Sequence, residues 1–248
     1  VLAANFFAPG DVTLARAPGR LDVMGGIADY SGSLVAEMPI AAVCCVAAQR
    51  TNDQTLVVRT ADAAANGLDP EVAFPLDVCK SVASLQAYLR SLPKPQKWAG
   101  YLAGAVLFAT EAGYTPQGQG WKLFVSSHVP VGAGVSSSAA VEVATMRSIC
   151  GAVGAEMEPM TMARLCQRKG RKFEKWRTAT FGIGGRQKSP STRTEELRRT
   201  IDFCHSIDTL PKPNRVGKGF GTRRNDSSVE GVEIAKRTTL RPASRTGG

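Results

Sequence analysis

The chain has 248 residues, a net charge of +10, and hydrophobic and charged fractions of 43% and 21%. These fractions are close to the averages of soluble globular proteins, so a soluble protein is the starting expectation. The longest apolar stretch, residues 35–48, is interrupted by Glu37 and Pro39. It is shorter than the ~20 residues that cross a bilayer, so we expect no membrane partner.

The six cysteines are scattered without a CxxC pair or a histidine-rich spacing. This pattern argues against a zinc site and against a disulfide framework. We interpret the cysteines as reduced thiols and expect a cytoplasmic protein. The chain begins at Val1 without a secretory signal pattern, so we expect the natural N-terminus to lie upstream.

The basic charge belongs to the last third of the chain. Residues 1–165 contain 11 Lys+Arg and 13 Asp+Glu, and the remaining basic excess falls in residues 166–248. A basic tail can bind nucleic acid by neutralising phosphates. Its Lys and Arg residues are not interleaved with the aromatic side chains on which bases stack, so we disfavour a nucleic-acid partner.

The first part of the chain predicts a mainly antiparallel sheet. Asp11–Val23 has the composition of two short strands on either side of a break at Pro18 and Gly19. Residues 34–49 and 55–59 are rich in β-favouring residues and predict further strands.

The next part alternates helices with one strand. Helical spacing predicts helices over residues 82–92 and 98–112 that pack on the sheet. Alternating apolar and polar residues predict a strand over 121–129, which Pro130 ends. Helix-forming residues then predict a helix over 136–149.

A last helix is expected from Pro159 to about Gln167, since proline favours the first turn of a helix. Beyond Gln167 the sequence has no sustained hydrophobic periodicity of a strand or a helix, and Lys, Arg, Thr, Ser and Gly dominate its composition. We therefore divide the chain into a domain at 10–167 and a basic, poorly ordered tail at 168–248, in which 195–204 is the one expected helix.

The clearest functional signal is the run Pro-Val-Gly-Ala-Gly-Val-Ser-Ser-Ser-Ala-Ala at residues 130–140, between the expected strand and helix. Glycines let the backbone approach a ligand closely, and the free N–H groups at a helix start attract anions. Serine hydroxyls there can cap the helix and contact a phosphate-bound Mg²⁺. We expect ATP contacts from Pro130, Gly132, Ala133, Gly134, Val135, Ser136, Ser137 and Ser138, and a Mg²⁺ contact from Ser138. A glycine and a capping serine alone could be purely structural, but eleven residues in this order are far more specific.

A second signal is Arg-Ala-Pro-Gly-Arg-Leu-Asp-Val-Met-Gly-Gly-Ile-Ala-Asp-Tyr-Ser-Gly-Ser at residues 16–33. Together the two runs resemble the motifs of the superfamily of galactokinase, homoserine kinase, mevalonate kinase and phosphomevalonate kinase (the GHMP kinases). The resemblance implies that Arg20 stabilises the transferring phosphoryl group, that Asp29 hydrogen-bonds sugar hydroxyls, and that Gly26 and Tyr30 line the sugar pocket. Each role suits the residue's chemistry.

The second run departs from ordinary galactokinases, in which Gly-Glu-His-Thr-Asp-Tyr is typical. Here Gly26 and Ile27 stand where the Glu and His would be. The loss of both side chains disfavours galactose as the substrate. The run resembles plant-type L-arabinokinase instead, so L-arabinose is the expected sugar. Asp29 alone could be a solvated turn residue, but its neighbours favour the binding role.

The resemblance covers roughly residues 10–167. The Gly-x-x-Asp-Gln-type segment with the family's catalytic Asp has no convincing match, and the Gly-Ile-Gly-Gly run at 182–185 only faintly echoes the third Gly-rich motif. No general base can therefore be assigned. The abrupt change after Gln167 suggests an altered reading frame or splice, which a comparison of transcript and genomic sequence would settle.

For the fold, the resemblance implies an α/β (α+β) domain of the ribosomal protein S5 domain 2 type, with the family's ferredoxin-like C-terminal domain absent or disrupted. For function, it implies an ATP- and Mg²⁺-dependent sugar-1-kinase of carbohydrate metabolism, present as an incomplete or inactive fragment. The alternative is a non-catalytic, kinase-like protein that binds nucleotide or sugar.

Overall fold

The structure is a computed structural model that describes residues 5–24, 36–166 and 236–240. The strands are β1 (Gly10–Met24), β2 (Ala36–Thr51), β3 (Thr55–Thr60), β4 (Glu71–Pro75), β5 (Gly120–Ser127) and β6 (Lys236–Leu240). The α-helices are α1 (Ala63–Asn66), α2 (Val82–Ser91), α3 (Gly100–Glu111) and α4 (Ser137–Val153), and the 3₁₀ helices are Leu76–Lys80 and Lys94–Ala99. A further helical segment spans 159–166.

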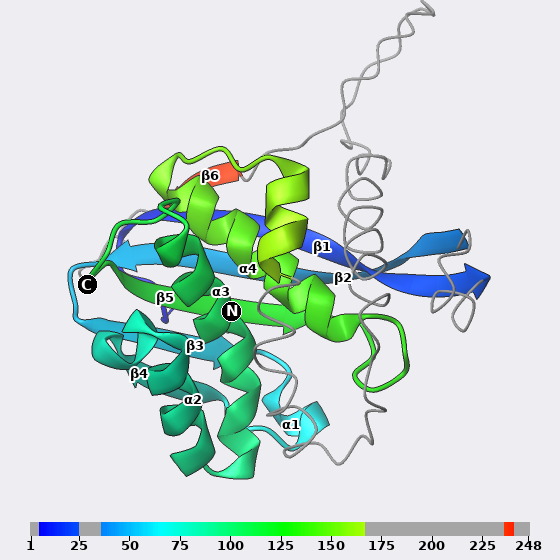
Figure 1. Cartoon of the computed structure of the whole chain (residues 1–248), viewed down its shortest axis with the longest axis horizontal. Coiled ribbons are helices and arrows are strands. Elements are labelled where there is room, and N and C mark those ends of the chain that lie inside the picture. Colours follow the sequence, from blue (N-terminus) through cyan, green and yellow to red (C-terminus); the bar gives the residue numbers. More distant parts are fainter. Residues whose placement is uncertain (1–4, 25–35, 167–235, 241–248) are drawn as a thin grey trace, which may run out of the picture.

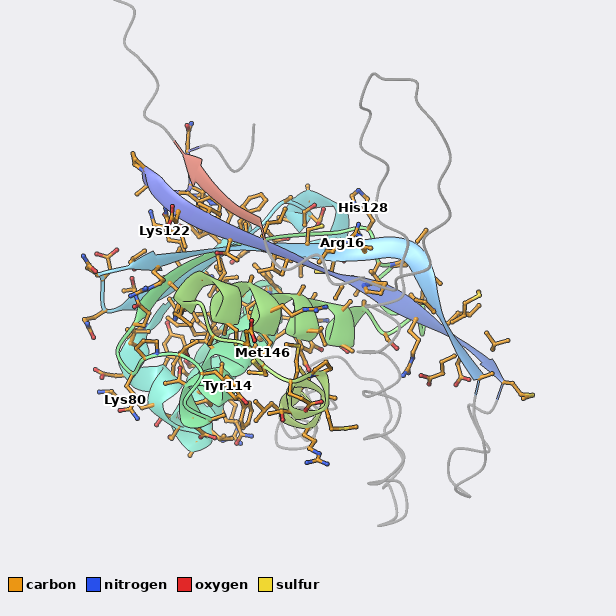
Figure 2. The ribbon with its side chains drawn as sticks, turned by 90° about the horizontal axis from the view of Figure 1, so that it is seen from above. Arg16, Lys80, Tyr114, Lys122, His128 and Met146 are labelled. Carbon is orange, nitrogen blue, oxygen red and sulfur yellow. The ribbon has the colours of Figure 1, made fainter. Side chains whose placement is uncertain are left out.

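The strands form one six-stranded sheet in the order β4-β3-β5-β2-β1-β6. All neighbouring pairs are antiparallel except β3 and β5, which run parallel. Helices α2, α3 and α4 cover one face of this sheet (Figure 1), and the turned view shows them together on one side of it (Figure 2). The mainly antiparallel sheet with packed helices, and the α/β fold class, are thus confirmed.

The core lies between this sheet face and the helices. The alternation along β5 buries Trp121, Leu123 and Val125, which are 1%, 0% and 4% exposed. Helix α3 is buried on nearly all sides, from Leu102 to Ala109, as expected for a helix that lies between the sheet and its neighbouring helices. Within the described residues no helix is long and apolar enough to span a membrane.

The opposite face of the sheet carries the segment 5–9. The Gln49 amide on β2 accepts from Ala8 N at 2.9 Å and donates to Ala8 O at 2.8 Å. Phe6 is only 3% exposed and lies against the Phe124 ring and under the Arg59 guanidinium. These contacts fix the start of the chain on the sheet face that α4 does not cover.

Strand β1 corrects one expectation. The sequence suggested two strands broken at Pro18 and Gly19, whereas β1 is continuous, with a register shift against β2 between Pro18 and Arg20. Proline is tolerated at bulges and edges, where its missing N–H is not needed. Since β6 pairs only as far as Leu14, β1 has no described neighbour on that side at Pro18.

The other elements differ in smaller ways. The expected helices at 82–92, 98–112 and 136–149 appear as α2, α3 and α4, and α3 is preceded by a 3₁₀ helix. Strands β4 and β6 were not expected, and β6 is the only part of the tail that the structure describes. The expected helix at 195–204 lies outside the described residues.

Candidate nucleotide-binding site

The loop between β5 and α4 has an unusual backbone. Gly132 and Gly134 both have φ of +77°, and a Cβ at either position would meet nothing within 4 Å. Glycine is therefore required there by conformation and not by space. Ser136 follows with φ 60° and is the only non-glycine residue of the described part with a positive φ. Such strain in a non-glycine residue clusters at functional sites.

The start of α4 corrects a second expectation, namely that a serine would cap the helix. Ser136 occupies the N-cap position, but its side chain makes no capping hydrogen bond. In the described part, the first-turn N–H groups of α4 therefore receive no such cap, and together with the helix dipole they form a site suited to an anion. The loop is open to solvent, since Val131 is 71% exposed and Gly132, Ala133 and Gly134 are exposed.

The two sequence runs meet in space. Arg20 N donates a hydrogen bond to Val135 O at 3.0 Å. A Cβ added to Gly19 would lie 2.7 Å from Val129 Cγ1, 2.9 Å from Ile40 Cδ1 and 3.0 Å from Val135 O. The bulge in β1 thus docks against both ends of the loop, and this close approach requires a glycine.

We predict that Gly19→Ala destabilises the protein by about 1–3 kcal/mol, the usual cost of overpacking a tight site. The added methyl would also push the backbone at Val135 away and weaken MgATP binding. Urea unfolding and calorimetric titration of the full chain measure the two effects. Stability and affinity equal to those of the unmodified chain would contradict the close docking of loop and strand.

Arg20, the expected transition-state stabiliser, forms an ion pair with Glu37 on β2. Its Nη1 lies 2.8 Å from Glu37 Oε2, and the two side chains are 17% and 4% exposed. Asp22 lies opposite Glu37 in the β1–β2 register. Sequence reasoning assigned no role to Glu37 or Asp22. The alternation of β1 places Arg20 and Asp22 on one face, but the pairing with β2 was not readable from the sequence.

Gly26, Asp29 and Tyr30, the expected sugar contacts, lie outside the described residues. They follow β1 in the chain and precede β2. Their roles stay predictions.

Ser137 and Ser138 lie in the first turn of α4 and are partly exposed. The described ranges contain no cluster of three His, Cys, Asp or Glu residues that could hold a metal ion. Mg²⁺ commonly arrives with nucleotide phosphates and keeps several waters, so it needs few protein ligands. A single hydroxyl such as that of Ser138 suits this mode of binding.

Cys44, Cys45, Cys79 and Cys150 are free thiols. Burial raises the pKa of Cys44 and of Cys150 to about 12. Both thiols therefore stay protonated near neutral pH and are unsuited to nucleophilic chemistry. Their role is packing in the core.

Residues 100–182 match the family model described as the GHMP kinases N terminal domain. The match includes the loop at 130–138 and runs past Gln167, where the resemblance had been expected to end. The boundary of the first domain at residue 167 stays a prediction.

Curated relatives are sugar kinases. The chain is 39% identical over 186 residues to L-arabinokinase from Arabidopsis thaliana, covering 64% of this chain and 18% of that protein. It is 34% identical over 131 residues to galactokinase from Roseiflexus sp. (strain RS-1), covering 53% and 29%. It is 30% identical over 198 residues to galactokinase from Haemophilus influenzae (strain PittGG), covering 79% and 46%. The chain thus spans less than half the length of each of these relatives.

Solved structures share the fold. Lactococcus lactis galactokinase, solved with galactose, matches with a TM-score of 0.55 at 18% identity, covering 79% of this chain and 41% of that chain. Methanococcus jannaschii mevalonate kinase also matches with a TM-score of 0.55, at 16% identity, covering 65% and 47%. These likenesses support the expected domain type. The expected loss of the second domain falls on residues outside the described part.

Proposed function

We propose that the chain carries the nucleotide- and sugar-binding half of an ATP-dependent sugar-1-kinase. The proposal starts from the family, since the N-terminal portion of this chain is a GHMP kinase N-terminal domain. The observation that carries the proposal is the hydrogen bond from Arg20 N to Val135 O, at 3.0 Å. It joins the strand with the catalytic arginine to the loop suited to phosphates. Two such motifs in contact are not explained by an ordinary strand-to-helix turn.

The proposed reaction transfers the γ-phosphoryl group of ATP to the anomeric hydroxyl of the sugar. A bond forms between that hydroxyl oxygen and the γ-phosphorus, the bond from the γ-phosphorus to the bridging oxygen breaks, and ADP leaves with that oxygen. Backbone N–H groups at 132–138 hold the phosphates, and the Arg20 guanidinium balances charge on the transferring group. Mg²⁺, held by the phosphates and Ser138, would neutralise further phosphate charge. The hydroxyl proton needs a base that this chain's matched motifs do not supply.

We propose L-arabinose as the sugar, bound by Asp29 beside Gly26 and Tyr30. The identity to L-arabinokinase supports this choice, as does the absence of the Glu and His of the galactokinase segment at positions 26 and 27. The free thiols of Cys44, Cys45, Cys79 and Cys150 suit a reducing, cytoplasmic location. The alternative, a nucleotide- or sugar-binding protein without catalysis, is favoured by the lack of a Gly-x-x-Asp-Gln-type segment after residue 167.

The substrate is tested by thermal unfolding of the full chain with L-arabinose, galactose or galacturonic acid. A ligand at 100 times its Kd stabilises the folded state by ~2.7 kcal/mol, and we expect the largest rise in Tm with L-arabinose. Asp29→Ala is expected to remove that rise. A larger rise with galactose would contradict the choice of sugar, and no rise with any sugar would leave only the nucleotide half of the proposal standing.

A further inference from the structure

The ion pair between Arg20 and Glu37 differs from the other two in the described part of the chain. The pair of Arg59 and Glu71 has side chains 34% and 41% exposed, and that of Lys80 and Asp77 is more exposed still. The Glu37 side chain is only 4% exposed. A carboxylate so far removed from water has a high desolvation cost, which its partner must offset.

Both ends of Arg20 are held. Its backbone N–H donates to Val135 O of the phosphate loop, and its Nη1 donates to Glu37 Oε2 at 2.8 Å. Because the register of β1 shifts between Pro18 and Arg20, the Arg20 backbone N–H can bind Val135 O while the Arg20 side chain still reaches Glu37 on β2. The first hydrogen bond holds the Arg20 backbone beside the loop, and the second holds its guanidinium beside Glu37 of β2.

The pair lies where β1 and β2 extend beyond the rest of the sheet. Strand β5 pairs with β2 only from Cys44 onward and ends at Ser127. Figure 1 shows the ends of β1 and β2 projecting past the other strands. A two-stranded ribbon gives little support of its own, so a cross-strand ion pair is a direct way to restrain an arginine side chain there.

We propose that Glu37 is a positioning residue, which orients the Arg20 guanidinium toward the γ-phosphate of a nucleotide bound at 132–138. This inference rests on the proposed function and adds a residue that acts through Arg20. A guanidinium has five N–H donors in a planar fork, so one can bind Glu37 while others face phosphate. Fixing one edge of the fork orients the other.

The test compares affinities for the MgATP analogue adenylyl imidodiphosphate and for MgADP, by calorimetric titration of the full chain. Glu37→Gln keeps the shape of the side chain and removes its charge. We expect MgADP affinity within about twofold of the unmodified chain, and a ratio of analogue to ADP affinity about tenfold lower. A tenfold change is at the low end of the effect of losing one hydrogen bond to a charged group, here the bond from the Arg20 guanidinium to the γ-phosphate. A purely structural ion pair would lower stability without changing this ratio.

Glu71→Gln is the matched control, since Glu71 also pairs with an arginine across two strands but lies away from the loop. Its ratio is expected to stay unchanged. Glu37→Asp keeps the negative charge but shortens the side chain. It is expected to lower the ratio of analogue to ADP affinity by a smaller factor than Glu37→Gln. If Glu37→Gln does not fold, Glu37→Asp provides the test. A ratio unchanged or raised in the Glu37 variants overturns the inference. If the unmodified chain binds neither nucleotide, the proposed function itself fails.

Discussion

Gly134→Val is expected to lower MgATP affinity by about 100-fold. Gly134 has φ of +77° in open space, so valine would be strained without any clash. A β-branched residue held there costs ~1–3 kcal/mol, and the loop is expected to relax to another conformation. That change removes one or two hydrogen bonds to phosphate, each worth ~1.5–3 kcal/mol. A total near 3 kcal/mol corresponds to about two orders of magnitude.

Gly113→Val is the matched control for this substitution. Gly113 has φ of +80°, and a Cβ there also meets nothing within 4 Å. Unlike Gly134, Gly113 lies outside the loop, just after the end of α3. Both variants should lose similar stability in urea unfolding. Only Gly134→Val should lose nucleotide affinity in calorimetric titration. Equal affinity of Gly134→Val and the unmodified chain would show that nucleotide binds elsewhere.

The unmodified 248-residue chain is expected to show no measurable sugar-kinase turnover. The sugar hydroxyl must lose a proton during transfer, and a general base typically contributes 10²–10⁴-fold. No segment after residue 167 matches the family motif that would supply such a base. The loss of this contribution should leave only background hydrolysis.

The assay is coupled ADP release. Separate reactions contain L-arabinose, galactose or galacturonic acid, and a further reaction contains no sugar. The expected result is a sugar-independent baseline in all three. Sugar-dependent ADP release would contradict the prediction and place an unassigned base within this chain. Replacement of Asp202, Asp208 and Asp226 one at a time would then identify it.

Much of the fold was readable from local patterns. The strand around Trp121 was predicted from its alternation, because one of its faces is buried against the helices. Helix α4 was predicted from its helix-forming residues, and it is buried along most of its length. Strand β4 was missed because it is a short edge strand with only Val72 and Phe74 buried. Strand β6 has no apolar alternation, and what places it is its backbone pairing with β1.

The candidate site was only partly readable. The glycines and serines of the loop predicted an anion site from local signals, and that site stays a prediction. The positive φ of Gly132 and Gly134 is the part of this signal that the structure shows. The Pro18–Gly19 pair was read as a turn because both residues favour turns. Here Gly19 instead allows close approach of the loop. The pairing of Glu37 with Arg20 could not be recognised from sequence, because it depends on a cross-strand register that local pattern does not specify.

The central claim is that this chain binds nucleotide through the loop at 130–138. Calorimetric titration of the unmodified 248-residue chain with MgATP tests it most directly. The account predicts saturable binding of one nucleotide per chain with a Kd of about 1 mM or tighter, retained by Gly113→Val and lost in Gly134→Val. No saturable heat from a chain that unfolds cooperatively, or equal binding by both variants, would contradict it.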